Sequence, residues 1–215
     1  MAKRRPVRNL LGLAVLTVLV QRPMHPYEMA SVLRARAKDR DMRIKWGSLY
    51  TVVGNLEKHG LIAAVESNRQ GARPERTVYR VTDAGLAEAA DWTRELLAAP
   101  ADEPSAFEAG LSVLGGLGPD EVAELLRRRL AVLERHVAAG RDELERDGRE
   151  VPRLFLLEAE YALAMRQAEA AWVRGLLAEL TDGTFPGLDA WRAYRETGRL
   201  PDDVAAAAER GRLDD

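Results

Sequence analysis

Cysteine is absent from all 215 residues of the sequence. Disulfides, cysteine-based zinc sites and thiol catalysis are therefore excluded, and the composition fits a reducing compartment. Glycine-rich phosphate loops, nucleophile elbows and closely spaced metal ligands are missing too, and the three histidines lie far apart without a carboxylate pattern that joins them. We therefore expect no enzymatic activity, no cofactor and no metal site.

An apolar run long enough to cross a bilayer is also missing. Residues 10–20 follow four basic residues within positions 3–8, so this start of the chain imitates a signal peptide. The run is too short to span a membrane, and residues 21–24 (Gln-Arg-Pro-Met) stand where a small-residue cleavage site would follow. We interpret it as the buried first helix of a cytoplasmic protein without a membrane partner.

Lysine is absent from residues 86–215, where 16 arginines face 27 acidic residues and the net charge is −11. Residues 1–85 carry 16 Lys and Arg against 7 Asp and Glu, a net charge of +9, so the overall −2 hides a strong asymmetry. A basic first domain joined to an acidic second one indicates a polyanionic partner for the first. Solvated surface charge without a partner is the alternative.

Apolar spacing predicts three helices at the start of a mainly helical chain. Residues 7–22 form the first, which is apolar on nearly all faces and ends before Pro23. The second starts near Pro26, because proline suits the first helical turn. The third runs from Gly47 or Ser48 to His59, and Gly60 is placed for a C-terminal cap.

The period of the pattern then changes. Residues 61–66 and 76–81 are predicted to be two strands, and the turn-forming residues 67–75 between them complete a hairpin. Thr82 caps a further helix, which Pro100 ends. Three helices followed by a two-stranded hairpin form a winged helix-turn-helix, and we assign this domain to residues 1–85.

The second half is predicted to be almost wholly helical. We assign a linker helix and a dimerisation domain to residues 86–182, and a short helix (187–196) with a frayed tail to residues 183–215. A long helix from Pro119 to Asp147 and another from near Pro152 form an antiparallel hairpin. Such a hairpin exposes apolar surface, which a second copy would cover, so we expect a homodimer. Packing on its own N-terminal domain is the alternative.

The third helix and the hairpin loop form the candidate DNA interface, since a helix exposed on one side fits the major groove. The start of the helix is expected to contact phosphate, and its next turn is expected to contact the base edges. The arginines of the loop are expected to contact phosphate or to enter the minor groove. The alternatives to these contacts are that Tyr50 is a core aromatic and that the loop arginines are ordinary solvated residues. Trp46 is expected to be a packing residue rather than a DNA contact. The assigned residues are Lys45, Ser48, Tyr50, Thr51, Asn55, Arg69, Arg73 and Arg76.

Three motifs, in register within residues 10–95, resemble the PadR family of transcriptional regulators. They are residues 23–28 (Pro-Met-His-Pro-Tyr-Glu), residues 47–50 (Gly-Ser-Leu-Tyr) with 56–62 (Leu-Glu-Lys-His-Gly-Leu-Ile), and residues 79–85 (Tyr-Arg-Val-Thr-Asp-Ala-Gly). The resemblance implies a homodimer that binds a palindromic operator, usually as a repressor, and that a small effector or another signal releases. It places Ser48 and Tyr50 near phosphate.

Two departures from the family pattern stand out. Pro26 replaces a usual glycine, and Val53-Gly54-Asn55 replaces a stretch of the third helix that often carries basic residues. We therefore expect the wing and the N-terminal arm, residues 3–8, to contribute more of the binding.

The resemblance also implies an effector site between the winged domain and the dimer helices. Trp92 and Trp172 are the candidate lining residues, because aromatic faces hold planar apolar ligands. Packing of both tryptophans in an interdomain core is the alternative. A protein–protein adaptor with a winged fold also remains open, and it predicts no DNA binding even at low salt, whereas a DNA-binding regulator shows a steep salt dependence.

Overall fold

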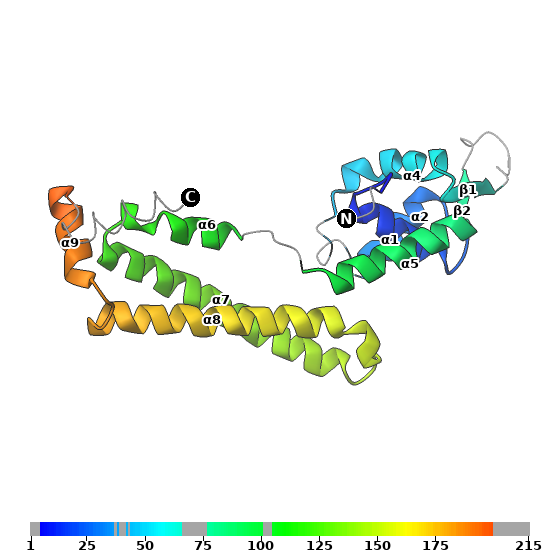
Figure 1. Cartoon of the computed structure of the whole chain (residues 1–215). Helices are drawn as coiled ribbons and strands as arrows, with labels where there is room; N and C mark the ends of the chain where they lie inside the picture. Colours follow the sequence, from blue (N-terminus) through cyan, green and yellow to red (C-terminus); the bar gives the residue numbers. More distant parts are fainter. Residues whose placement is uncertain are drawn as a thin grey trace. The chain divides into compact units, whose positions relative to one another are not determined.

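The computed structural model describes residues 5–36, 38, 42, 44–65, 77–100 and 105–199. The chain divides into two compact units, Met1–Asp102 and Glu103–Asp215. The described residues are mainly helical and hold one two-stranded antiparallel sheet (Figure 1). The predicted fold class, a winged helix-turn-helix followed by a helical region, is therefore confirmed.

Helix α1, Leu10–Leu19, forms the centre of the first unit and packs against α2, α4 and α5. The Asn9 side chain caps it by accepting a hydrogen bond from the backbone N–H of Leu11 at 2.9 Å. Nearly every residue of α1 is buried, as its apolar composition predicts. The helix is shorter than the predicted 7–22, because Asn9, which has an extended backbone, caps its start, and Met24 beyond its end pairs with the hairpin.

Helix α2, Pro26–Ala35, begins where the sequence predicts. His25 caps it: its Nδ1 accepts a hydrogen bond from the backbone N–H of Tyr27, and Glu28 accepts one from the backbone N–H of His25, which completes a capping box. Met29 and Leu33 turn inward and join the core around α1.

The third helical segment consists of a short 3-10 turn, η1 (Trp46–Ser48), and helix α4, Leu49–Lys58. Gly60 has a φ of +68° and ends α4 as predicted. Its backbone N–H donates to the carbonyl of Glu57, and that of Leu61 donates to the carbonyl of Leu56, which is the hydrogen-bond pattern of a Schellman cap.

Strands β1, Ile62–Val65, and β2, Val78–Val81, form the base of the predicted hairpin, with Ile62 opposite Val81. Both are shorter than predicted within the described residues. Met24 also pairs with Tyr79 in an antiparallel bridge, and each backbone N–H donates to the other's carbonyl at 3.0 Å. The predicted loop 67–75, with Arg69 and Arg73, and Arg76 beside it lie outside the described residues.

Helix α5, Asp83–Ala98, follows, and Thr82 caps it as predicted by accepting a hydrogen bond from the backbone N–H of Gly85 at 3.1 Å. A Cβ atom at Gly85 would lie 2.0 Å from the carbonyl oxygen of Leu61. Only glycine at this position allows the first turn of α5 to lie so close to the start of the hairpin.

The second unit is built on a long antiparallel helical hairpin of α7, Pro119–Asp147, and α8, Leu157–Asp182 (Figure 1). The start of α7 and its end before Gly148 agree with the sequence pattern. Helix α8 begins later than predicted, because Pro152 opens a 3-10 turn, η3 (Arg153–Phe155), before the α-helix starts. The remaining elements are α6 (Ala106–Ser112), η2 (Leu114–Gly116) and α9 (Leu188–Thr197).

The core of this unit occupies one end of the hairpin only. Val122, Leu126, Val173 and Leu180 are buried there, beside residues of α6 and α9. Between Leu133 and Ala170 no residue is buried, although the structure describes this whole stretch. The half of the hairpin nearest the α7–α8 turn therefore has no core of its own. In the described part of the chain, every helix is too short or too polar to span a membrane.

Candidate nucleic-acid interface

Helix α4 has one buried and one exposed face. Leu49, Val52, Val53 and Leu56 pack into the core, whereas the predicted contact residues Tyr50, Thr51 and Asn55 are exposed, as is Gly54. The side chain of Tyr50 is 67% exposed, so its interpretation as a core aromatic is wrong. The alternation leaves a polar helix face that is free to meet a partner.

The start of α4 is fixed by hydrogen bonds within the chain. The Ser48 hydroxyl donates to the carbonyl of Lys45 at 2.8 Å and accepts from the Asn9 side-chain amide at 3.5 Å. Ser48 is half-buried and Lys45 is exposed. The expected donation by Ser48 to phosphate therefore competes with an internal bond, whereas the Lys45 ammonium faces solvent. Trp46 packs against the core as expected, with the Arg34 guanidinium 4.5 Å from its ring centroid.

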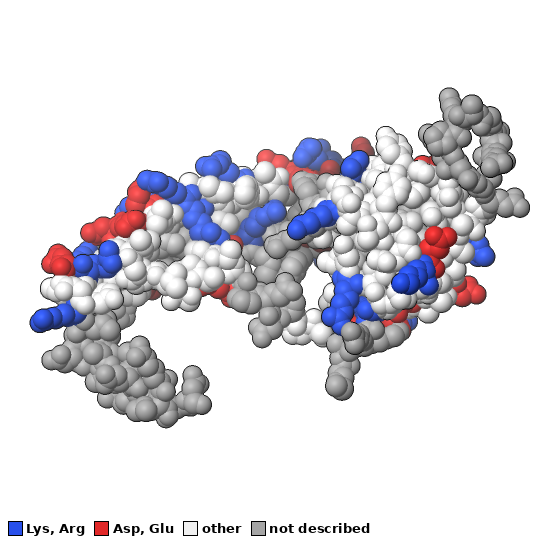
Figure 2. Space-filling model, turned by 90° about the horizontal axis from the view of Figure 1, so that it is seen from above, with Lys and Arg blue, Asp and Glu red and all other residues white. Residues whose placement is uncertain are grey.

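The exposed face of α4 carries little charge. Its first two turns are neutral, and Glu57 and Lys58 follow at the C-terminal end. Figure 2 views the first unit from the side on which α4 lies in Figure 1, and most of the surface there is uncharged. The face is not acidic. The cations that the sequence assigns to this interface are Lys45 and the wing arginines, and the wing arginines lie outside the described residues.

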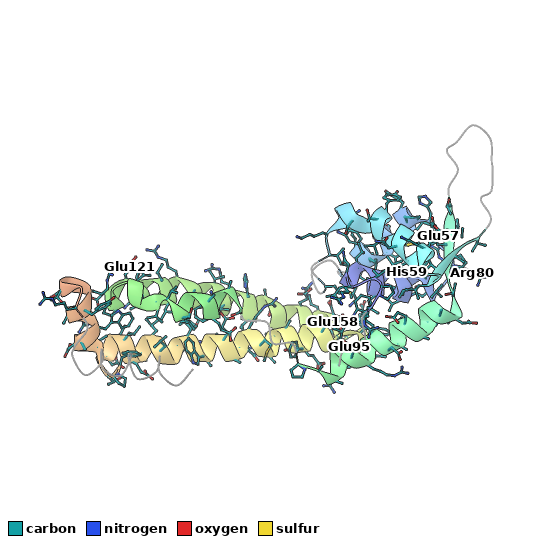
Figure 3. The ribbon with its side chains drawn as sticks, turned by 45° about the horizontal axis from the view of Figure 1, so that its top comes forward. Glu57, His59, Arg80, Glu95, Glu121 and Glu158 are labelled. Atoms are coloured by element: carbon teal, nitrogen blue, oxygen red, sulfur yellow. The ribbon has the colours of Figure 1, made fainter. Side chains whose placement is uncertain are left out.

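Glu57 links α4 to the hairpin. The Tyr79 hydroxyl of β2 donates to the Glu57 carboxylate at 3.4 Å, and Figure 3 labels Glu57 near the end of α4. Burial raises the pKa of Tyr79, and the neighbouring Glu57 carboxylate raises it further, so the hydroxyl remains a donor at neutral pH. The hairpin and the exposed helix are thereby held as one surface.

The N-terminal segment 5–9 overlaps the predicted arm and adds Asn9, which the sequence reasoning did not assign to the interface. Asn9 contacts Ser48, and Val7 is buried so close to Gly12 that a Cβ there would lie 2.8 Å from Val7 and 3.7 Å from Val52. The segment therefore runs beside α4, and its Arg8 is exposed. The one local signal for this arrangement is Asn9, a good N-cap residue directly before the apolar run.

The arm was expected to supply freely exposed cations, and for Arg5 this expectation is wrong. Its residue surface is 8% exposed, and its guanidinium donates to Glu88 and to Glu95 at 2.5 Å each. The guanidinium also lies 5.3 Å from the ring centroid of Trp92. Arg5 is thus committed to α5, while Lys3 and Arg4 lie outside the described residues.

The two candidate effector residues lie in different units. Trp92 is 5% exposed, in the core of the first unit. Trp172 is 51% exposed, and it meets Phe107 edge-on at 5.9 Å between ring centroids. Arg129 lies 3.7 Å from the Phe107 ring centroid. A shared effector space lined by both tryptophans stays a prediction.

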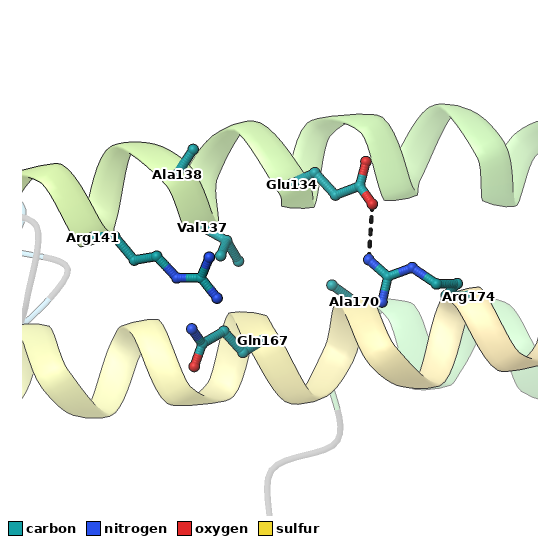
Figure 4. A pocket seen from close by; sticks show the side chains of 7 residues that line it. All are labelled: Glu134, Val137, Ala138, Arg141, Gln167, Ala170 and Arg174. Atoms are coloured by element: carbon teal, nitrogen blue, oxygen red, sulfur yellow. Dashed lines mark hydrogen bonds and ion pairs between the residues drawn. The ribbon is translucent and has the colours of Figure 1, made fainter.

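A polar pocket lies between α7 and α8 within the second unit (Figure 4). Arg174 donates to Glu134 across it at 2.8 Å. Neither tryptophan lines this pocket. Its lining residues are Glu134, Val137, Ala138, Arg141, Gln167, Ala170 and Arg174. Among the described residues, no three His, Asp or Glu side chains are grouped to hold a metal ion.

A helical core, an outward-facing α4 and a two-stranded hairpin define the first unit as a winged helix-turn-helix. Residues 15–91 match the model of the family described as the transcriptional regulator PadR-like family. The family resemblance is therefore confirmed, as a similarity of residues 15–91 to this family. No curated protein sequence matches the chain.

Solved structures of this fold extend the likeness into the helical half. Bacillus subtilis PadR in complex with operator DNA has a TM-score of 0.65 at 19% identity, covering 81% of this chain and 99% of that one. The same protein with p-coumaric acid has a TM-score of 0.65 at 17% identity, covering 80% and 99%. The Vibrio cholerae virulence activator AphA has a TM-score of 0.59 at 21% identity, covering 80% and 98%. At these identities the likeness shows the fold alone.

Proposed function

We propose that this protein is a transcription regulator that binds a palindromic double-stranded operator in the cytoplasm. The observation that carries the proposal is the exposed, uncharged polar face of α4, where Tyr50, Thr51 and Asn55 stand opposite a fully packed face. Hydroxyl and amide groups on such a helix can hydrogen-bond to base edges and phosphates in the major groove. Lys45, Arg69, Arg73 and Arg76 supply the cationic contacts.

The protein acts as a homodimer through its helical hairpin. Helix α8 and the turn before it carry large exposed apolar residues at helical spacing, and the neighbouring end of the hairpin lacks a core. A second copy of the hairpin would cover this surface, which we call the α8 stripe and define as Leu154, Leu157, Tyr161, Met165 and Trp172. The two copies of α4 would then meet half-sites about 34–36 Å apart.

The solved structures support both the partner and the control by a ligand. Bacillus subtilis PadR is known with operator DNA and with p-coumaric acid. By analogy, this chain represses its target, and a planar small molecule releases it. Trp92 and Trp172 remain the candidate effector residues. AphA is a virulence activator, so the direction of regulation requires its own test.

Footprinting on the DNA upstream of the protein's own gene tests DNA binding. We expect a protected palindrome, with an affinity that falls steeply as salt rises. The absence of binding at low salt would favour the protein–protein adaptor. Transcription in vitro from the footprinted promoter then separates repression from activation.

Release by a ligand is tested on the same footprinted duplex. Planar aromatic acids are titrated against the complex, and a compound that lowers the affinity is tested again with Trp172→Leu. Loss of the response is expected if Trp172 contacts the ligand. Because Trp172 also belongs to the α8 stripe, the response is compared at duplex concentrations scaled to the affinity of the variant without ligand. An intact response in this variant would remove Trp172 from the effector site.

A further inference from the structure

An open depression lies on the first unit beside α4, and its lining is basic. Arg5, Pro6, Arg8 and His59 line it, and His59 stands at the C-terminal end of α4 (Figure 3). No carboxylate belongs to this lining. Arg8 is exposed and, within the described part of the chain, has no carboxylate partner. The depression therefore offers donors to an anion.

The other arginine of this depression is held in place by its own contacts. Arg5 donates to two carboxylates of α5, Glu88 and Glu95, and lies over the ring of Trp92. Its Nε is buried and has no hydrogen-bond partner among the described residues. Glu88 is buried as well, so both charged groups of this ion pair are shielded from solvent. Arg5 thus ties the N-terminal segment to α5 at a fixed point.

The chain between Arg5 and α1 has a second attachment, at its other end. Asn9 contacts Ser48, and Val7 packs between these two points beside Gly12. Arg8 lies within this doubly attached segment, so its backbone position relative to α4 is set before any partner binds. A preorganised cation loses less freedom on binding than one on a loose arm.

We propose that this depression is a seat for a DNA backbone phosphate, contacted by Arg8 and His59, and that Arg5 is the residue that positions the segment. The inference rests on the proposed function. When α4 lies in the major groove, the phosphates of the adjoining strand flank the helix, on the sides where residues 5–9 and His59 stand. The seat offsets the lack of cations in the first two turns of α4.

The first experiment measures the affinity for the footprinted duplex as a function of salt. Arg8→Gln is compared with Arg94→Gln, a matched control on α5, where Arg94 is exposed and pairs with Asp91. We expect Arg8→Gln to reduce the slope of log K against log salt by about 1 for each subunit bound, and to weaken binding roughly fivefold to tenfold per subunit near 0.1 M salt. His59→Gln is expected to act in the same direction with a smaller effect.

The second experiment tests positioning by Arg5 with a double-mutant cycle. Arg5→Gln is expected to reduce the slope of log K against log salt by the same amount as Arg8→Gln. Adding Arg8→Gln to the Arg5→Gln variant should reduce this slope little further. If Arg5 has only a structural role in stability, the effect of Arg8→Gln would persist in full. Arg5→Lys should restore part of the slope, because it keeps a cation between the two glutamates.

The outcomes separate this inference from the proposed function. If the wild-type protein binds the duplex and Arg8→Gln leaves the slope unchanged, the phosphate seat is wrong and the regulator stands. If the cycle is additive, the positioning role of Arg5 is wrong. If the wild-type protein binds no DNA at low salt, both proposals are overturned.

Discussion

The two units differ in how completely they bury their own apolar residues. In the first, α1 is enclosed by α2, α4 and α5, and the largest core side chains are fully buried. In the second, the hairpin has a core only at the end near α6 and α9. The first unit therefore encloses its own core, whereas the second leaves large apolar residues exposed, and the proposed dimer would cover them.

The largest expected effect comes from placing a charge on the α8 stripe. Met165→Arg should raise the dissociation constant of the homodimer by at least about a hundredfold, because burial of an unpaired charge costs several kcal/mol. Analytical ultracentrifugation would measure it. Ala178→Arg, on another exposed face of α8, is the control and should leave the dimer intact. Equal behaviour of the two variants would contradict the assignment of the stripe as the dimer surface.

A smaller effect, confined to the first unit, is expected at Gly85. Gly85→Ala would place a Cβ 2.0 Å from a backbone oxygen, and we expect a loss of about 3 kcal/mol in stability from overpacking. Native-state hydrogen exchange of the α1 amides reports on this unit alone. Gly54→Ala is the matched control. Its Cβ meets nothing within 4 Å, and alanine favours a helix interior by up to about 1 kcal/mol. A gain in stability at both positions would refute the close approach.

On the exposed face of α4 we expect a change in binding without a change in fold. Tyr50→Phe removes one hydroxyl from a side chain that is 67% exposed. The affinity for the footprinted duplex should fall about fivefold, the equivalent of about 1 kcal/mol for one hydrogen bond. Thermal unfolding should be unchanged, and Tyr194→Phe on α9 serves as the control. Arg73→Ala is expected to weaken binding as well, and unchanged affinity in both variants would refute the assigned contact surface.

The smallest effect concerns the cap of α2. The backbone N–H of His25 lowers the pKa of Glu28, and Arg22 lowers it further. The ionised carboxylate therefore stabilises the fold above its ordinary pKa of 4.5, and this contribution is lost as the pH falls through the lower folded value. Glu28→Gln should cost roughly 0.5 kcal/mol near pH 7 and progressively less as the pH falls below 4.5. A cost that does not depend on pH would exclude the charge as its cause.

Local signals in the sequence predict most of the fold. The Pro26 start, the Gly60 end and the Thr82 cap follow from the chemistry of single residues, and each is found where expected. The exposed face of α4 follows from the spacing of its apolar residues. The similarity of residues 15–91 to the PadR-like family follows from three short motifs.

What the sequence did not predict depends on contacts between distant residues. In the sequence, Arg5 cannot be told apart from the other cations of the basic arm, because its partners Glu88 and Glu95 lie far along the chain. The internal bond of Ser48 depends on Asn9, which no helical spacing connects to it. Helix α1 ends early for the same kind of reason, since Met24 pairs with Tyr79. Pairings of this kind are set by tertiary packing rather than by propensity.

The bridge between Met24 and Tyr79 has a consequence for how the wing can diversify. Strand β2 is hydrogen-bonded on one edge to β1 and on the other to the chain between α1 and α2. Insertions or deletions between Val65 and Thr77 would therefore leave the helices undisturbed, because the base of the hairpin is held by backbone pairings that do not involve those residues. Under the proposed function, a change in the length or composition of this segment would alter which operators are bound while the same scaffold is kept.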